Sequence, residues 1–158
     1  MLTTENLSQR RDELVLTVRR FLSAFNDGDL DGSVAMFTED GLYRTFEGVE
    51  RRGRAAIRRE LAPQFRGVYG RISFTELDLF VDPVSARAAL RWRCVHDFRV
   101  AAGRGLDDLR RRGWRALYGH VASWEGADIL HLEVGGAGQV SAKHTYAKAR
   151  LPLTRRGP

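Results

Sequence analysis

Apolar residues recur at helical spacing near the start of the chain. Leu14, Val18, Phe21 and Phe25 lie three or four positions apart, with charged residues between them. This spacing predicts an amphipathic helix over residues 8–26, which an Asn-Asp-Gly sequence then ends. The next segment predicts a short second helix capped by Asp29, followed by a turn at 39–41. A strand at 42–46 and a returning strand at 49–52 come next. A third helix begins at Gly53 and is limited by Pro63.

From residue 71 the apolar period changes to two, which is typical of half-buried strands. The Gly- and Arg-rich segment 101–119 is predicted to be a long loop with a possible short helix at 106–112. A Gly-rich hairpin turn at 135–138 and a loosely ordered tail at 151–158 complete the pattern. The four predicted strands are 72–81, 86–99, 121–134 and 140–148.

Helices followed by a strand meander indicate an α+β fold. We expect one domain over residues 1–150, built as a cone-shaped barrel. Its curved, mainly antiparallel sheet would carry the N-terminal helices on its concave face. The hollow left between them is a natural pocket for a small molecule.

Composition narrows the function classes. The 158 residues are 43% hydrophobic and 29% charged, which excludes a disordered or membrane-embedded chain. With no signal peptide evident and Cys94 as the single cysteine, we expect a cytoplasmic protein without an internal disulfide. The arginines behind the +6 charge are scattered, so no nucleic-acid or membrane partner is expected. Metal-ligand spacings and Gly-rich nucleotide loops are missing from the sequence, so we predict no metal and no cofactor.

Four segments carry a family resemblance: VRRFLSAFNDGDLDGSVAMFTEDG at 18–41, GRAAIR at 53–58, DILHLE at 128–133 and GQV at 138–140. Over residues 15–148 the chain resembles the nuclear transport factor 2-like superfamily, closest to the SnoaL-like polyketide cyclases and ketosteroid isomerases. The resemblance implies a cone-like α+β barrel, a homodimer, and either an enzyme or a non-catalytic binding domain. Fold alone does not decide between these.

The isomerase residues carry over only in part. The resemblance puts the oxyanion-binding tyrosine at Phe21, the general base near Thr45 and the protonated aspartic acid at Asp128. Two of the three positions therefore lack the required group, and we reject steroid isomerisation by that set. The Arg-x-Asp pair of limonene-epoxide-hydrolase-like members is also missing from residues 91–97.

Strand alternation supplies the candidate acid–base groups. Asp128 shares a face with Leu130 and Leu132, where desolvation would raise its pKa and suit acid–base work. The alternative is an acid at the strand start, bonded to the backbone or an arginine. Arg91 and Arg93 should face solvent, which turns their neighbours inward. These inward neighbours are Leu90, Trp92, Cys94 and His96.

Each of the remaining candidates has two interpretations. His96 is either a proton shuttle or a hydrogen-bonded strand-end histidine, and Cys94 is more typical of a packing thiol than of a nucleophile. Tyr43, on the face of Thr45, is either an oxyanion donor or a core tyrosine. His144 faces the site unless the register slips by one residue, which would turn Lys143 inward. The predicted substrate-binding residues are Phe21, Phe25, Thr45, Trp92, Cys94, Trp124 and Leu130.

The leading hypothesis is a cofactor-independent enzyme of secondary metabolism acting on an apolar, polyketide- or terpenoid-like molecule. Asp128 would transfer protons, with His96 or His144 as its partner and Tyr43 polarising an oxygen, in cyclisation, isomerisation or epoxide opening. The alternative is a non-catalytic binding or assembly module. A cavity filled by aromatic rings would favour the module, and an open one with Asp128 at its base would oppose it.

Overall fold

The computed structural model describes residues 4–100, 105–135 and 138–148. The predicted turn at 135–138 lies partly outside these residues, and the tail at 151–158 lies wholly outside them. The helices are α1 (Thr4–Asn26), α2 (Leu30–Ala35), α3 (Arg54–Phe65) and α4 (Leu106–Tyr118). The strands are β1 (Phe37–Arg44), β2 (Glu50–Arg52), β3 (Arg71–Asp82), β4 (Arg87–Asp97), β5 (Val121–Leu132) and β6 (Val140–Lys148).

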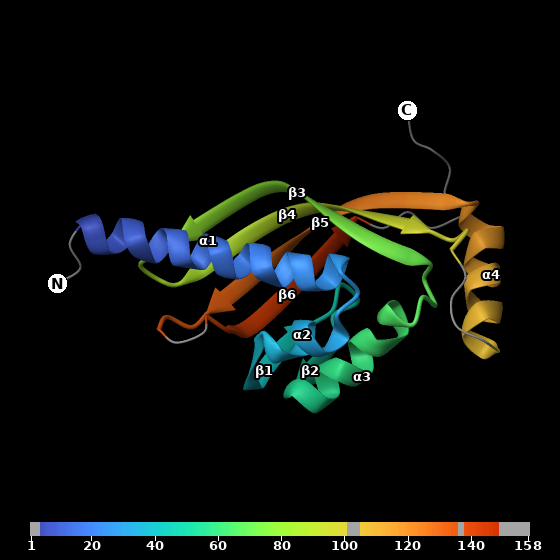
Figure 1. Cartoon of the computed structure of the whole chain (residues 1–158), viewed down its shortest axis with the longest axis horizontal. Coiled ribbons are helices and arrows are strands. Elements are labelled where there is room, and N and C mark those ends of the chain that lie inside the picture. Colours follow the sequence, from blue (N-terminus) through green and yellow to red (C-terminus); the bar gives the residue numbers. More distant parts are fainter. Residues whose placement is uncertain (1–3, 101–104, 136–137, 149–158) are drawn as a thin grey trace.

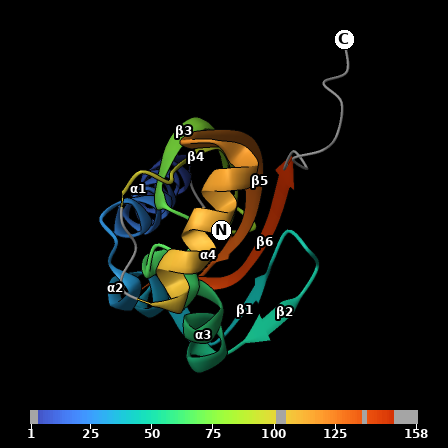
Figure 2. The same ribbon diagram turned by 90° about the vertical axis from the view of Figure 1, so that its right-hand side faces the viewer.

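The six strands form one curved sheet in the order β2-β1-β6-β5-β4-β3. Only β1 and β6 pair in parallel, and the other neighbouring pairs are antiparallel. The sheet wraps partly around the N-terminal helices without closing, and α4 crosses one end of it (Figures 1 and 2). The predicted α+β class is therefore confirmed, with the hollow bounded by a sheet whose edges are β2 and β3.

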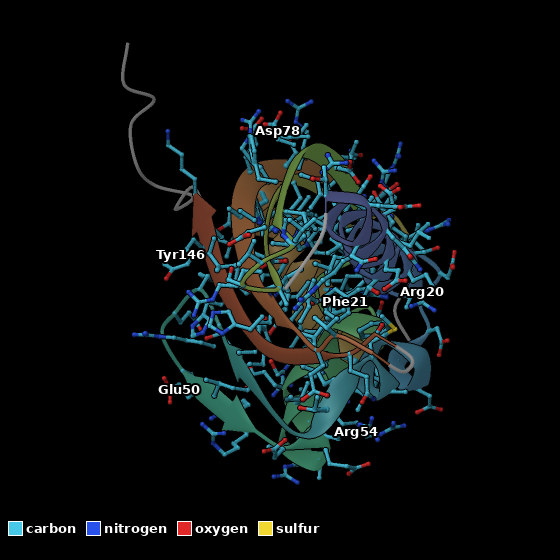
Figure 3. All side chains as sticks on the ribbon, turned by 90° about the vertical axis from the view of Figure 1, so that its left-hand side faces the viewer. Arg20, Phe21, Glu50, Arg54, Asp78 and Tyr146 are labelled. Carbon is cyan, nitrogen blue, oxygen red and sulfur yellow. The ribbon has the colours of Figure 1, made fainter. Side chains whose placement is uncertain are left out.

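The predicted apolar stripe of α1 packs against the concave face of the sheet. Leu14, Val18 and Phe21 are all buried, and the Phe21 ring lies 5.5 Å from the ring of Phe37 at the start of β1. Burying side chains of this size stabilises the fold by roughly 1.5–3 kcal/mol each. Figure 3 shows Phe21 in the interior, whereas Tyr146 lies at the outer margin.

Two predicted boundaries are wrong. β1 begins at Phe37, so residues 39–41 lie within a strand and form no turn. A register shift against β6 between Phe37 and Leu42 absorbs this acidic stretch as a bulge, which a period-two pattern does not reveal.

The second correction concerns α4, which extends well beyond the predicted 106–112. Gly113 lies inside the helix instead of ending it. Asp107 and Asp108 in the first turn favour the helix because acids complement the positive end of its dipole. The buried side chain of Arg111 donates a hydrogen bond to the carbonyl of Phe98 and fixes the helix to the end of β4.

Candidate functional site

A cavity of about 390 Å³ lies against the concave face of the sheet. Its walls come from α1, α3, α4 and all strands except β2. Aromatic rings dominate the lining, and the chain's three tryptophans, Trp92, Trp114 and Trp124, all take part. Other lining residues include Phe21, Leu22, Phe25, Tyr43, Thr45, Phe46, Tyr69, Phe74, Cys94, His96, Tyr118, Asp128, Lys143 and Thr145. The hollow thus remains open although many rings border it.

Gly126, which has no side chain, leaves space for the Trp92 ring in the cavity wall. Gly126 on β5 pairs with Trp92 on β4. A Cβ atom at Gly126 would lie 2.4 Å from the Trp92 ring and equally close to the carbonyl oxygen of Tyr146. Neither the buried ring nor the backbone can give way by that amount. The Gly126 position therefore sets how the Trp92 ring lies in the wall.

The polar end of the cavity, formed by Asp128, Lys143, Thr145 and Tyr43, holds a hydrogen-bonded charge pair. The Lys143 Nζ donates to Asp128 Oδ1 at 2.9 Å and to Thr145 Oγ1 at 2.5 Å. The Thr145 hydroxyl donates in turn to Asp128 Oδ1 at 2.7 Å. Antiparallel pairing of β5 and β6 places Asp128 opposite Thr145, which fixes this geometry.

The polar end retains unused hydrogen-bonding capacity. An ammonium group has three donors and a carboxylate has two acceptor oxygens. Among the described residues, Lys143 uses two donors and every hydrogen bond to Asp128 ends on Oδ1, so Oδ2 is free. The Lys143 Nζ also lies 4.7 Å from the centre of the Tyr43 ring, a cation–π arrangement. A ligand can therefore meet a donor and an acceptor side by side.

Lys143 stays protonated despite its burial. Only 8% of each side chain of the Lys143–Asp128 pair is exposed. Burial acts to lower the pKa of Lys143, but the charge of Asp128, with contributions from Tyr43 and the hydrogen bond, raises that pKa above its ordinary value. The desolvation of such a pair offsets most of its attraction, so a buried ion pair is a poor stabiliser compared with apolar side chains. Stability alone gives little reason for charges here.

The histidine end of the cavity, formed by His96 and Cys94, is neutral and satisfied. His96 Nδ1 lies 2.8 Å from the carbonyl oxygen of Tyr69, so Nδ1 carries the hydrogen and donates it. Nε2 is then the acceptor for the Cys94 thiol, whose Sγ is 3.2 Å away. Burial lowers the pKa of His96 and raises the pKa of the Cys94 thiol to about 12. Both groups therefore remain uncharged at neutral pH.

The two ends are too far apart to exchange a proton directly. His96 pairs with Ala122 on β5, and Asp128 is six residues further along that strand. At about 3.3 Å per residue the two positions are roughly 20 Å apart along the strand. His96 and Asp128 therefore make no direct contact, although both residues face the cavity as expected.

The structure also revises His144 and Leu130. Neither residue lines the cavity. His144 lies on the opposite face of the sheet from Lys143, with its ring 5.6 Å from that of His131, and Leu130 is fully buried in the core. Every other predicted site residue borders the cavity. These are Asp128, His96, Tyr43, Trp92, Cys94, Phe21, Phe25, Thr45 and Trp124.

Lys143, the stated alternative to His144, faces the cavity because of a bulge. Val140 is buried, so simple alternation from Val140 turns His144 inward and Lys143 outward. The pairing with β5 instead skips Ser141, because Leu132 pairs with Val140 and His131 with Ala142. One extra residue reverses the face of everything that follows. The sequence gives little signal for this exchange, because β6 mixes polar and apolar residues and contains both of the chain's lysines, Lys143 and Lys148.

The described residues contain no group of three or more His, Cys, Asp or Glu side chains placed to hold a metal ion. No described helix is long and apolar enough to cross a membrane. Several lining groups can hold a polar part of a ligand: Asp128, Lys143 and Tyr43 at the polar end, and elsewhere in the wall Glu47, Glu60, Gln64 and the Trp92 Nε1, which has no hydrogen-bond partner among the described residues.

Comparisons with known proteins agree with this architecture. The model of the SnoaL-like domain family matches residues 18–136. No curated protein matches the chain in sequence.

Solved structures share the fold at low identity. A provisionally assigned polyketide cyclase from Xanthomonas campestris has a TM-score of 0.61 at 19% identity, over 87% of this chain and 91% of its own. PrhC from Penicillium brasilianum scores 0.66 at 17% identity, over 88% and 82%. A ketosteroid isomerase-like protein from Erwinia carotovora scores 0.62 at 15% identity, over 89% and 97%.

Proposed function

The chain belongs to the SnoaL-like domain family, and on this premise we propose that it is an enzyme that transfers protons on an apolar small molecule held in the cavity. The observation that carries the proposal is the Asp128–Lys143–Thr145 cluster, a desolvated charge pair with an unused acceptor and donor in an aromatic cavity. A buried lysine whose pKa is raised, lying in a cleft, favours a functional over a structural role.

The residues of the polar end have two different roles in acid–base catalysis, one as proton acceptor and one as hydrogen-bond donor. Asp128 Oδ2 accepts a proton from a carbon or hydroxyl of the ligand, because Oδ1 is already occupied by Lys143 and Thr145. The third N–H of Lys143 donates to an oxygen on which negative charge develops, and Tyr43 lines the same end. Preorganised donors in a dry site are worth more than donors in water.

Cyclisation, isomerisation and epoxide opening all use this pair of roles. Each reaction moves a proton to or from carbon or oxygen at an apolar centre and needs no redox step. We keep the polyketide- or terpenoid-like substrate as part of the proposal, supported by the aromatic lining and by the similarity to the provisionally assigned polyketide cyclase. A homodimer in the cytoplasm and a single domain over residues 1–150 also remain proposals.

The alternative, a non-catalytic binding module, has one observation in its favour. Phe21 and Thr45 stand where the isomerases have their tyrosine and base, so that catalytic set is incomplete. The open cavity opposes this alternative, because the rings of Trp92, Phe21, Phe25 and Phe46 border the hollow without filling it. A binding module also has no evident use for a buried charge pair.

Hydrogen–deuterium exchange into an apolar ketone tests the proposal. β-Tetralone has two fused rings and acidic C–H groups next to its carbonyl, and quenching of the three cavity tryptophans reports its binding. We expect the wild type to accelerate exchange in D₂O, and Asp128→Asn to bind the ketone but lose about 10²–10⁴-fold in rate. Glu125→Gln is the matched control, since Glu125 lies on the same strand and pairs with Arg93 outside the cavity. Equal rates for Asp128→Asn and wild type would refute the role of Asp128.

A further inference from the structure

Helix α4 exposes apolar side chains on the face that points away from the molecule. Leu106, Leu109 and Leu117 are 61%, 64% and 57% exposed. With Gly113 they follow the spacing i, i+3, i+7, i+11, which puts them on one side of a helix. Figures 1 and 2 show α4 standing across one end of the sheet, with no other described helix or strand against its outer side. We call these four residues the leucine stripe.

The opposite face of α4 belongs to the cavity. Trp114 and Tyr118 border it, and the Trp114 ring lies 5.9 Å from Tyr69 on the cavity wall. The helix is thus amphipathic, but its leucines face outward while arginine and aromatic side chains pack inward. An exposed apolar stripe of this kind calls for a covering partner.

Positive charge flanks the leucine stripe on both sides. Arg110 lies one turn after Leu106, and Arg112 one turn after Leu109; both are exposed. The two acids of α4 are turned toward the body of the protein. Asp107 pairs with Arg66, and Asp108 with Arg111 and Arg112. The outer face therefore presents apolar side chains beside two arginines: Arg110, which has no acidic partner among the described residues, and Arg112, which shares Asp108 with Arg111.

An open hollow beside the stripe adds a second feature. It is lined by Arg112, Arg115, Ala116, Gly119 and His120, and Arg115 Nη2 lies 2.9 Å from His120 Nε2. Guanidinium groups match the oxygens of a phosphate. An apolar stripe next to a basic hollow is complementary to an anionic phospholipid, in which acyl chains lie beside a negatively charged headgroup.

We propose that α4 docks on an anionic phospholipid surface, with the leucine stripe entering the acyl boundary and the arginines meeting the headgroups. Interfacial helices combine these two interactions. A second copy of this chain fits less well, because two α4 helices face to face would oppose arginine to arginine. The docking is peripheral, so it requires no membrane span, and it revises the expectation that the protein has no membrane partner. Because α4 also forms part of the cavity wall, this docking would bring the cavity close to a membrane that holds apolar molecules.

Vesicle co-sedimentation with the full chain tests the proposal. We expect the wild type to bind vesicles of phosphatidylcholine with phosphatidylglycerol, and to ignore phosphatidylcholine alone. Leu109→Ser with Leu117→Ser should bind at least about tenfold more weakly, because less apolar surface is inserted. Arg110→Gln should cost about fivefold. The matched control is Leu16→Ser with Val84→Ser, two residues 61% and 63% exposed away from α4, which should bind like the wild type.

Four outcomes would overturn the proposal. The leucine variant binding as tightly as the wild type would mean that the +6 net charge alone attracts the vesicles. Absence of wild-type binding would contradict it directly. Self-association that the leucine variant abolishes would assign the stripe to a second copy. Binding to an amphipathic Glu/Leu peptide, with no vesicle binding, would assign it to an acidic protein. Because vesicle binding is read without any ketone, its failure leaves the proposed proton transfer untouched.

Discussion

The two ends of the cavity contain similar ingredients and differ in what they leave unused. Each end buries titratable side chains among aromatic rings: Asp128 with Lys143 at one end, His96 with Cys94 at the other. At the histidine end both ring nitrogens have partners and both groups are neutral. At the polar end the groups are charged, and one carboxylate oxygen and one ammonium hydrogen remain available.

The contrast shows that burial of a titratable group does not by itself mark a catalytic one. A histidine is the usual candidate for proton transfer near neutral pH. Here the carbonyl of Tyr69 and the Cys94 thiol occupy His96 completely. Free hydrogen-bonding capacity facing a cavity separates the working end from the structural one.

The largest expected effect is on stability when the charge pair is broken. Lys143→Met leaves Asp128 buried without its counter-ion, so the free energy of unfolding should fall by about 3–5 kcal/mol in urea titrations. Replacing both members, with Lys143→Met and Asp128→Leu, should recover most of this loss. The control is Lys148→Met, an exposed lysine on the same strand, which should change stability by no more than about 0.5 kcal/mol. A double variant as unstable as the single one would mean that the pair itself holds the fold.

The next largest effect is on ligand affinity, which should distinguish the two ends of the cavity. Tyr43→Phe removes a hydroxyl from the polar end, so the Kd for β-tetralone should rise several-fold, equivalent to about 1 kcal/mol for one hydrogen bond. Tryptophan quenching measures it. Cys94→Ala at the histidine end should leave the Kd for the ketone within about twofold, because that thiol is committed to His96. Equal effects of the two changes would remove the distinction between the ends.

The two ends should respond to pH in opposite directions. Burial lowers the pKa of His96, so its contribution to stability is present above its ordinary value of 6.5 and is lost as pH falls below it. The pKa of Lys143 is raised, so its contribution is present below the ordinary value of 10.5 and is lost only as pH rises beyond it. Urea titrations at acid, neutral and alkaline pH of wild type, His96→Gln and Lys143→Met measure this. A loss of wild-type stability below pH 6.5 that persists unchanged in His96→Gln would contradict the assignment.

The smallest effect concerns the thiol. With a pKa of about 12 and a buried sulfur, Cys94 has almost no thiolate at neutral pH. Iodoacetamide should leave it unmodified in the folded protein and alkylate it in urea, as followed by mass spectrometry. Rapid alkylation of the native protein would mean that the histidine end opens or that its thiol is activated.

Most of the fold could be predicted from the sequence because apolar residues recur regularly, at helical spacing in α1 and at every second position in the strands. Leu14, Val18 and Phe21 mark α1, and period-two alternation places Trp92, Cys94 and His96 inward as found. The predictions fail where an extra residue interrupts the hydrogen-bond ladder between two strands. The bulge at Ser141 exchanges His144 for Lys143, and neither composition nor apolar period encodes that exchange. The distance between His96 and Asp128 likewise depends on strand pairing, which a linear pattern does not contain.

We assign proton transfer to the polar end of the cavity and not to the histidine end. The most direct test compares deuterium exchange into bound β-tetralone for Asp128→Asn and His96→Gln at saturating ketone. We predict a loss of about 10²–10⁴-fold for Asp128→Asn and less than about threefold for His96→Gln, with both variants folded by circular dichroism. A large loss in His96→Gln with exchange preserved in Asp128→Asn would contradict the account.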